Sequence, residues 1–474
     1  MMQILSLGIH YSTGELLVPP IDEQSFGATI LGSLAQNADT LANLTRATTL
    51  GQTFRGEVKR RVIDTGDPRS VGWTILVNQN DPHKDDMLRV LAPLAKHRAM
   101  KSPDSLLFYN GEPIDEWFDW LSENYSSLNM GQKPQYILIA GGPDQVPFLF
   151  QSMLGTVAST GRVAFDSLQD LENYVEKLIR LETAPAPAVE RETVFFAPDY
   201  RLPDPTYYSC HYLAKPLAEQ VADDLGFKTH QITGSEATKA RLQETLRMAR
   251  PALVFTASHG LSADDQPFEI QKQLNGAICC QRPPGTLKDE NWLFRAEDVP
   301  LDEPFLEGAA FFQFACFGYG TPAESDFAHW DPSIPQKNAP ADFIAALPKR
   351  LLAHPRGPIV YVGHVDVALL HGFADPDNPV PALGERWNSR IEPFRSALHR
   401  ILAVDPISLA MEDMSARYNI TNAQLSSTFD RLKRGKINPT PDFHARLASL
   451  FLTRSDAQNY MVFGDPAASL RIPS

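Results

Sequence analysis

The stretches ALVFTASHG (252–260) and AAFFQFACFGYG (309–320) decide the fold of this chain. Each begins with an apolar run and ends in glycines, with one reactive side chain just beyond the run. Apolar runs of this length predict buried strands of a parallel sheet, here at 252–257 and 309–315. Reacting groups gather beyond the carboxyl ends of such strands, so we expect His259 and Cys316 to face one another.

The segments before these strands alternate between apolar runs and amphipathic stretches. A strand is expected at 194–197, followed by a helix that Gly226 closes, a short strand at 228–232, and a helix that Thr238 caps and that extends through Arg250. This order predicts a parallel sheet with right-handed crossovers and helices on both faces.

The same α/β pattern continues towards both ends of the chain. Further strands are expected at 73–77, 106–108, 136–140, 359–362 and 460–463. Further helices are expected at 114–125, at 166–182 with Asp166 as its cap, at 343–352, and through much of the last eighty or so residues. The Ala-Pro steps of 183–192 break a helix, so we place a boundary there and expect two units, 1–185 and 186–474.

Composition limits the classes of function. The 474 residues are 43% apolar and 21% charged, as in ordinary globular proteins. Lys and Arg number 43 against 57 Asp and Glu, and the net charge of −14 has the wrong sign for holding nucleic acid. No apolar run reaches about 18 residues, so we expect no membrane partner. Phosphate-loop, zinc-helix, nucleophile-elbow and complete dinucleotide motifs are absent, so we expect no cofactor and no metal.

Cysteine usage and the N-terminal stretch indicate the compartment. Cys210, Cys279, Cys280 and Cys316 are too few and too irregularly spaced for a disulfide framework or a zinc site. The opening MMQILSLGIHYSTGELL lacks a basic segment and does not read as a signal peptide. We therefore expect a cytoplasmic protein with free thiols.

A cysteine and a histidine at neighbouring strand ends suit nucleophilic catalysis. The thiolate is the nucleophile, and an adjacent imidazolium lowers the thiol pKa and can protonate a leaving amine. The N–H groups of Gly260 and Cys316 would stabilise the oxyanion of a tetrahedral intermediate. The alternative is a structural histidine beside a small core cysteine.

The His-Gly after one strand and the Ala-Cys after the next resemble the catalytic dyad of the caspase–gingipain clan of cysteine peptidases. Three other segments resemble its gingipain-type branch: ILIAGGPDQVP (137–147), GRVAFDSLQDLENYVEKLIRLE (161–182) and YMVFGDPAASLRIP (460–473). The resemblance extends from about 137 to the C-terminal end of the sequence.

This resemblance implies a caspase/gingipain-like α/β fold of two adjacent three-layer subdomains with mainly parallel sheets and a helical C-terminal portion. Residues 1–185 would form the non-catalytic subdomain and 186–474 the catalytic one. The resemblance also implies that Cys316 is the nucleophile, His259 the general acid and base, and Gly260 an oxyanion-hole donor. It assigns no third catalytic residue here.

Specificity is less constrained by the sequence. The loop after 194–197 holds Asp199, which would favour a basic substrate side chain, and Arg201, which would favour an acidic one. Gingipain-type peptidases favour Arg or Lys, which selects Asp199, although an exposed turn is the simpler interpretation. His364 and Asp366 follow a further strand, so they either shape the substrate groove or form a structural hydrogen bond.

The function predicted from the sequence is a cysteine endopeptidase that cleaves a protein or peptide substrate after a basic residue through an acyl-enzyme. A catalytically silent caspase-like binding or scaffold module is the alternative, and acyl transfer to an amine is a third reading. A cytoplasmic protease must be restrained. We therefore expect an activating partner, with the Pro-rich loops near 261–308 and 321–340 covering the cleft.

Overall fold

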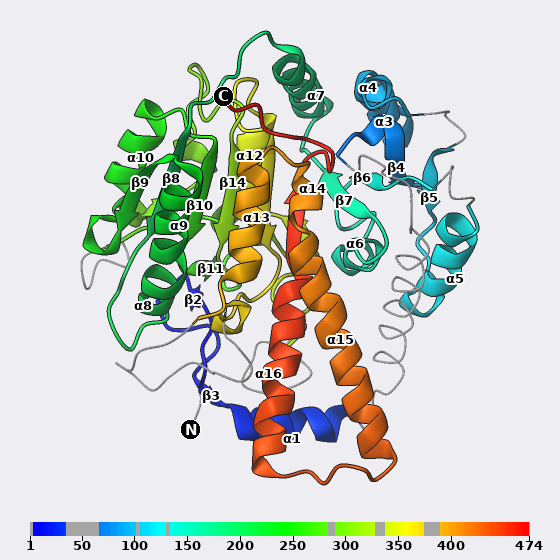
Figure 1. The fold of residues 1–474 in the computed structure, drawn as a ribbon, viewed down its shortest axis with the longest axis vertical. Coiled ribbons are helices and arrows are strands. Elements are labelled where there is room, and N and C mark those ends of the chain that lie inside the picture. The colour runs from blue at the N-terminus through cyan, green and yellow to red at the C-terminus, as the bar shows by residue number, and fades with distance from the viewer. Residues whose placement is uncertain are drawn as a thin grey trace.

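The computed structural model describes residues 3–34, 66–100, 105–128, 133–282, 290–327, 337–373 and 389–473. Its centre is one large sheet (Figure 1). The strands of this sheet are β4 (Trp73–Asn78), β5 (Leu107–Tyr109), β6 (Tyr136–Ala140), β7 (Ser159–Val163), β8 (Glu192–Ala197), β9 (Lys228–Thr233), β10 (Leu253–Ala257), β14 (Ala310–Phe314), β17 (Val360–His364) and β18 (Tyr460–Phe463). They lie side by side in the order β5-β4-β6-β7-β18-β17-β14-β10-β8-β9.

The last strand joins the two halves of this sheet. β5, β4, β6 and β7 pair in parallel on one side, and β17, β14, β10, β8 and β9 pair in parallel on the other. β18 lies between β7 and β17, parallel to the first and antiparallel to the second. The predicted mainly parallel sheet is therefore confirmed, and its two halves form one continuous layer.

Helices cover both faces. The helices are α1 (Glu23–Leu34), α3 (Pro68–Val71), α4 (Lys84–His97), α5 (Trp117–Leu121), α6 (Phe148–Leu154), α7 (Leu168–Thr183), α8 (Thr206–Ser209), α9 (Lys215–Leu225), α10 (Lys239–Met248), α11 (Phe268–Leu274), α12 (Ala346–Ala353), α13 (Glu392–Leu402), α14 (Ile407–Ala410), α15 (Glu412–Lys433) and α16 (Pro441–Gln458).

Alternate residues of β6 show why the layers form. Leu138 packs into one apolar core, whereas Ile137 and Ile139 pack into a second core on the opposite face. The first core includes α4 and α7, and the second includes α5 and α6. Successive strand side chains point to opposite faces, so a strand that is apolar throughout needs helices on both.

The C-terminal helices extend away from the sheet. α15 and α16 lie side by side, and α1 crosses α16 at the far end of the pair (Figure 1). α1 therefore packs against the C-terminal helix α16. The predicted helical C-terminal portion is confirmed.

Short strand pairs complete the described structure. They are β1 (Gln3–Ile4) with β3 (Ile21–Asp22), β2 (Gly8–His10) with β11 (Gly260–Ser262), β12 (Ile278–Cys279) with β13 (Leu293–Phe294), and β15 (Gly320–Thr321) with β16 (Phe343–Ile344). The pairing of β2 with β11 is parallel and carries the N-terminal segment past the end of β10.

Most predicted elements are present, with two corrections. Ser167, not Asp166, caps α7, because its hydroxyl accepts the Asp170 N–H at 3.1 Å. The helix expected from Phe343 begins only at Ala346, since Phe343 and its neighbour form strand β16. The predicted α/β class is confirmed, while the division into 1–185 and 186–474 stays a prediction.

Candidate active site

The predicted pair His259 and Cys316 lies beyond the carboxyl ends of β10 and β14. These strands are parallel neighbours, with Ala257 opposite Phe314. His259 follows β10 by two residues, Cys316 follows β14 by two, and the two residues are 1% and 0% exposed. Both therefore lie at one edge of the sheet, enclosed by protein.

Gly260 brings the two loops into main-chain contact. A Cβ on Gly260 would lie 1.9 Å from the carbonyl O of Cys316 and 2.5 Å from its N, which no side chain tolerates. Only glycine permits this approach. The Gly260 N–H donates to the carbonyl O of Leu7 at 2.7 Å.

The imidazole of His259 is held at both nitrogens. Nε2 lies 2.9 Å from Oδ2 and 3.0 Å from Oδ1 of Asp204, and Nδ1 lies 3.2 Å from the carbonyl O of Leu7. The ring of Tyr200 stacks on the imidazole with centroids 5.8 Å apart. A carboxylate only accepts, so Nε2 carries a proton and Nδ1 faces the Leu7 peptide.

Asp204 is the carboxylate that contacts His259, and no pattern in the sequence assigned it. Burial alone would raise its pKa, but the charge and hydrogen bonds of His259, with those of Thr206, outweigh burial and lower the pKa below its usual value. Asp204 is therefore ionised and accepts the Nε2–H of His259.

The position of Asp204 in the sequence indicates that it could reach this sheet edge. Residues 198–205 follow β8, which is the parallel neighbour of β10, so this loop ends at the same sheet edge. It contains Asp199 as well as Asp204. The Asp204 N–H donates to the carbonyl O of Arg201 at 2.9 Å, which turns the chain back towards His259. That turn, not composition, selects which aspartate reaches the imidazole.

Asp199 and Arg201 lie in the same loop and are engaged elsewhere. Oδ2 of Asp199 lies 3.0 Å from Nε2 of His211, and Oδ1 accepts the Arg201 N–H at 2.7 Å. Arg201 is exposed and has a φ of 67°. Among the contacts of the described residues, neither side chain joins the pair of His259 and Asp204.

The thiol of Cys316 is hydrogen-bonded to main chain. Its Sγ accepts the Ala368 N–H at 3.1 Å and lies 3.5 Å from the carbonyl O of the same residue. Burial raises the pKa of this thiol far above its usual value. In the described ranges no hydrogen bond joins the thiol to His259. The thiol is therefore protonated in this form.

His364 and Asp366 hold the turn that follows Cys316. The Phe317 N–H donates to the carbonyl O of Asp366 at 2.9 Å, and the Tyr319 N–H donates to that of His364 at 3.0 Å. Nδ1 of His364 lies 3.3 Å from the carbonyl O of Asp366, and both side chains are buried. The structure thus places them beside the nucleophile turn, and their role in a substrate groove stays a prediction.

Metal-ligating clusters and long apolar helices would point to other kinds of site. Within the described ranges, no three His, Cys, Asp or Glu side chains are grouped so as to hold a metal ion. No helix in the same ranges combines the length and the apolar composition needed to cross a membrane. All four cysteines are buried and unpaired.

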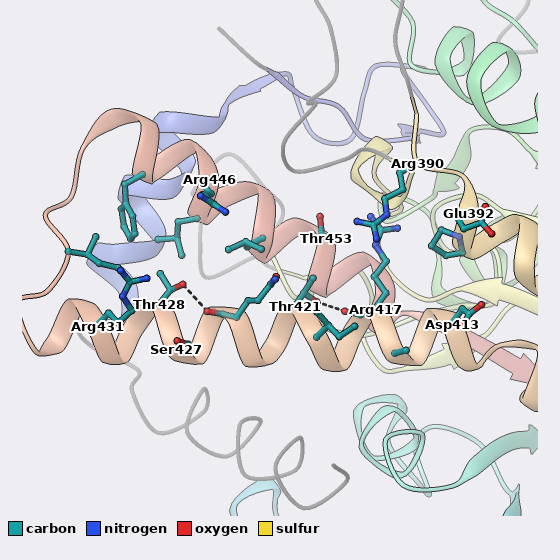
Figure 2. Close-up of a pocket in the computed structure, with 18 residues that line it drawn as sticks. Arg390, Glu392, Asp413, Arg417, Thr421, Ser427, Thr428, Arg431, Arg446 and Thr453 are labelled. Atoms are coloured by element: carbon teal, nitrogen blue, oxygen red, sulfur yellow. Dashed lines mark hydrogen bonds between the residues drawn. The ribbon is translucent and has the colours of Figure 1, made fainter. Parts of the chain in front are cut away.

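A separate groove of about 910 Å³ runs between α15 and α16 (Figure 2). Its lining combines aliphatic side chains and hydroxyl groups with two carboxylates and four arginines, namely Glu392, Asp413, Arg390, Arg417, Arg431 and Arg446. None of the site residues predicted from the sequence lines this groove.

Comparison with known proteins adds a likeness of fold. No family model matches the chain, and no curated protein matches it. Among solved structures, the Arg-specific cysteine proteinase gingipain R is similar at 11% identity, over 87% of this chain and 80% of that one, with a TM-score of 0.44. A complex of the pro- and mature domains of RgpB from Porphyromonas gingivalis is similar at 12% identity, over 84% of this chain and 80% of that one, with a TM-score of 0.44.

A third structure, described as a protease, is similar at 9% identity over 84% of this chain and 78% of that one, with a TM-score of 0.46. Gingipains are the proteins whose motifs the sequence resembles. Similarity at this level assigns no residue and no activity to this chain, so the assignment of the site depends on its own contacts.

Proposed function

We propose that this protein is a cysteine endopeptidase that hydrolyses peptide bonds through Cys316 and His259. One observation carries the proposal. The imidazole of His259 and the N–H of Gly260 both contact the carbonyl O of a single peptide group, that of Leu7, and the Cys316 thiol lies next to it. A nucleophile, a proton carrier and an oxyanion donor around one carbonyl are what acyl transfer requires.

Acylation follows from these positions. Nδ1 of His259 takes the thiol proton, and Sγ of Cys316 attacks the carbonyl carbon. The negative charge that develops on the carbonyl O is stabilised by the Gly260 N–H together with that of Cys316. The imidazolium then protonates the leaving amine as the C–N bond breaks. A thioester on Cys316 remains.

Deacylation uses the same groups in reverse. Water adds to the thioester carbon and gives a proton to His259, which returns it to Sγ as the carboxylic acid leaves. Asp204 keeps its charge throughout and holds the imidazole by Nε2, so that Nδ1 stays directed at the reacting bond. Asp204 is thus a positioning residue.

The preference for a basic residue before the scissile bond stays a prediction. Asp199, the acidic residue suggested for that role, is already paired with His211 at 3.0 Å. A basic substrate side chain would have to compete with that pair. The side chain next to the reacting groups is the apolar Leu7, which supports a different preference, argued below.

A reducing compartment suits this chemistry. The four unpaired cysteines include the proposed nucleophile, and a free thiol persists where disulfides do not form. This supports the expected cytoplasmic location. The substrate would be a protein or peptide, since main-chain groups around the site bind the chain on both sides of one peptide bond.

A silent binding module is the second candidate, and one observation favours it. The Cys316 thiol is fully buried, its pKa is raised, and in the described ranges no hydrogen bond joins it to His259. If the thiol never passed its proton to His259, the protein would bind without hydrolysis.

Peptide hydrolysis by the full chain separates the candidates. Peptides with leucine, arginine, lysine or aspartate before one bond would be incubated with the protein and the products identified by mass spectrometry. We expect cleavage by the wild type, loss of cleavage in Cys316→Ala and His259→Ala, and retention in Cys210→Ala, a matched change of another buried cysteine. Cleavage that persists in Cys316→Ala, or none by any folded form, would reject the peptidase.

A further inference from the structure

The chain's own N-terminal segment lies across the candidate active site as an extended strand. The Leu7 N–H donates to the carbonyl O of Ala368 at 3.0 Å, and the Leu370 N–H donates to that of Leu5 at 3.1 Å. Ser6 forms an antiparallel bridge with Leu369 between them. This alternation is that of an antiparallel ladder, the way an extended peptide adds to a strand edge.

Beyond Leu7 the segment continues through the site. Gly8 to His10 form β2, which pairs in parallel with β11, the strand that begins at Gly260. The segment is therefore bound by main chain on both sides of the Leu7–Gly8 peptide bond. An endopeptidase holds its substrate in this way, because both the acyl part and the leaving part of the chain must be fixed.

The reacting groups converge on this one bond. The carbonyl O of Leu7 accepts the Gly260 N–H at 2.7 Å and lies 3.2 Å from Nδ1 of His259. A Cβ placed on Gly8 would lie 3.2 Å from Sγ of Cys316, so the thiol lies beside the residue that follows this carbonyl. The oxyanion donor, the proton carrier and the nucleophile thus surround the Leu7–Gly8 bond.

The side chain before this bond is apolar and enclosed. Leu7 has 0% of its surface exposed and belongs to the main apolar core. Ile4, Leu5 and Ser6 are buried as well. Aliphatic surroundings bind leucine through its buried area, whereas a charged side chain there would lose its hydration without a partner.

We propose that Leu7–Gly8 is a self-processing site, and that the cleft takes polypeptides with a leucine-like aliphatic residue before the scissile bond. This inference rests on the proposed peptidase function. While uncut, the segment fills the cleft and keeps other substrates out, so the expected restraint comes from the N-terminal strand. The loops 261–308 and 321–340, which we expected to cover the cleft, lie partly outside the described residues.

The step balances as an ordinary hydrolysis. Sγ of Cys316 bonds to the carbonyl carbon of Leu7 while its proton passes to His259, and the C–N bond to Gly8 breaks as that proton reaches the amine. Water then splits the thioester. The products are residues 1–7 with a new carboxylate and a chain that begins with the amine of Gly8.

Intact mass and N-terminal sequence of the purified full chain test this proposal over time. We expect the wild type to lose residues 1–7 at a rate independent of protein concentration, because the reaction is intramolecular. Cys316→Ala should keep its full mass. Leu7→Ala should be cut at least about tenfold more slowly than the wild type, because an apolar pocket lowers the rate by about this factor when methylene groups are missing from the side chain. Val18→Ala, a matched change of another buried aliphatic residue, should be cut at the wild-type rate.

A second variant separates this proposal from the function on which it rests. In Leu7→Asp the unpaired charge should drive the segment out of the cleft, so a peptidyl electrophile with leucine at its recognition position should label Cys316 about tenfold faster than in uncut wild type. Labelling of Cys316 in Leu7→Asp without any cut at Leu7–Gly8 in the wild type would overturn self-processing and leave the peptidase. Labelling in no folded variant would overturn both.

Discussion

His259 is the residue on which the proposed chemistry depends, because its two nitrogens are divided between Asp204 and the Leu7 peptide. Its position and that of Cys316 follow from the strands that precede them, so both were predicted from the sequence. Asp204 was not, since its contact with the imidazole requires a turn within a loop. Burial and hydrogen bonding thus add Asp204 to a candidate site for which the sequence predicts His259 and Cys316.

Replacing the Asp204 carboxylate tests its positioning role. In Asp204→Asn the imidazolium loses its ionised partner, so we expect kcat to fall by about 10²- to 10⁴-fold, the usual contribution of acid–base catalysis, with little change in KM. Steady-state kinetics on a cleaved peptide would measure both constants. Asp199→Asn is the matched control, because Asp199 pairs with His211 instead, and an equal loss of kcat there would contradict this assignment.

Because the pKa of Asp204 is lowered in the folded chain, the stability of the fold should depend on pH. The pKa of Asp204 in the folded chain lies below the value of about 3.9 in the unfolded chain. Asp204 therefore stabilises the fold above about pH 4, and this contribution is lost as pH falls through the lower folded-state pKa. The difference in free energy of unfolding between wild type and Asp204→Asn should shrink from about pH 7 to about pH 3. A difference that grows on acidification would be inconsistent with this account.

Glycine at position 260 is required by the contact with Cys316. In Gly260→Ala the new Cβ would meet the Cys316 carbonyl, so we expect a loss of about 1–3 kcal/mol of stability and loss of hydrolysis. Chemical denaturation and a peptide assay would measure these effects. Gly32→Ala in α1 meets nothing within 4 Å and should be neutral or slightly stabilising. Full activity in Gly260→Ala would show that the close approach is not needed.

Elements with an uninterrupted apolar run were predicted best. β6 and β18 lie at the predicted residues, β10 begins one residue later than predicted, and β14 is one residue shorter than predicted at each end. β7 was missed because its sequence, STGRV, carries a buried arginine. Arg162 donates to Gln151 and to the carbonyls of Gly141 and Val146 at 2.7 to 2.8 Å. The hydrogen-bond partners of Arg162 are distant in the sequence and meet it only in the folded chain. The sequence of β7 therefore lacks the apolar pattern by which a buried strand is predicted.

The N-terminal segment escaped prediction for a related reason. β1, β2 and β3 are two or three residues long and pair with distant parts of the chain, so local periodicity does not predict them. Only the completed fold brings Leu7 to the ends of β10 and β14. The segment that supplies the proposed internal substrate is therefore one that no local pattern in the sequence predicts.

At the scale of the whole molecule, the residues that follow β18 connect the two halves of the sheet. Asp465 is fully buried and accepts the indole N–H of Trp73 at 2.8 Å and Nε of Arg98 at 2.6 Å. Arg98 also forms a two-bond ion pair with Glu182 at the end of α7. The C-terminal stretch that resembles a gingipain segment thus binds the first half of the chain to the second.

Removing this carboxylate should weaken the whole fold. In Asp465→Ala the Trp73 indole loses its acceptor, and the guanidinium of Arg98 loses one of its two carboxylate partners. We therefore expect the free energy of unfolding to fall by about 3–5 kcal/mol. Thermal or chemical unfolding would measure it. Asp166→Ala breaks only an exposed ion pair with Lys349 and should cost less than about 1 kcal/mol. Equal losses in the two variants would refute the connecting role of Asp465.

The most direct test of the peptidase is to trap its covalent intermediate. Rapid acid quenching of the self-processed chain with a leucine peptide ester, followed by peptide mapping, would locate the acyl group. The account predicts a thioester on Cys316, cleaved by hydroxylamine, and none in Cys316→Ala or His259→Ala. An acyl group on another residue, or turnover of the ester by Cys316→Ala, would contradict it.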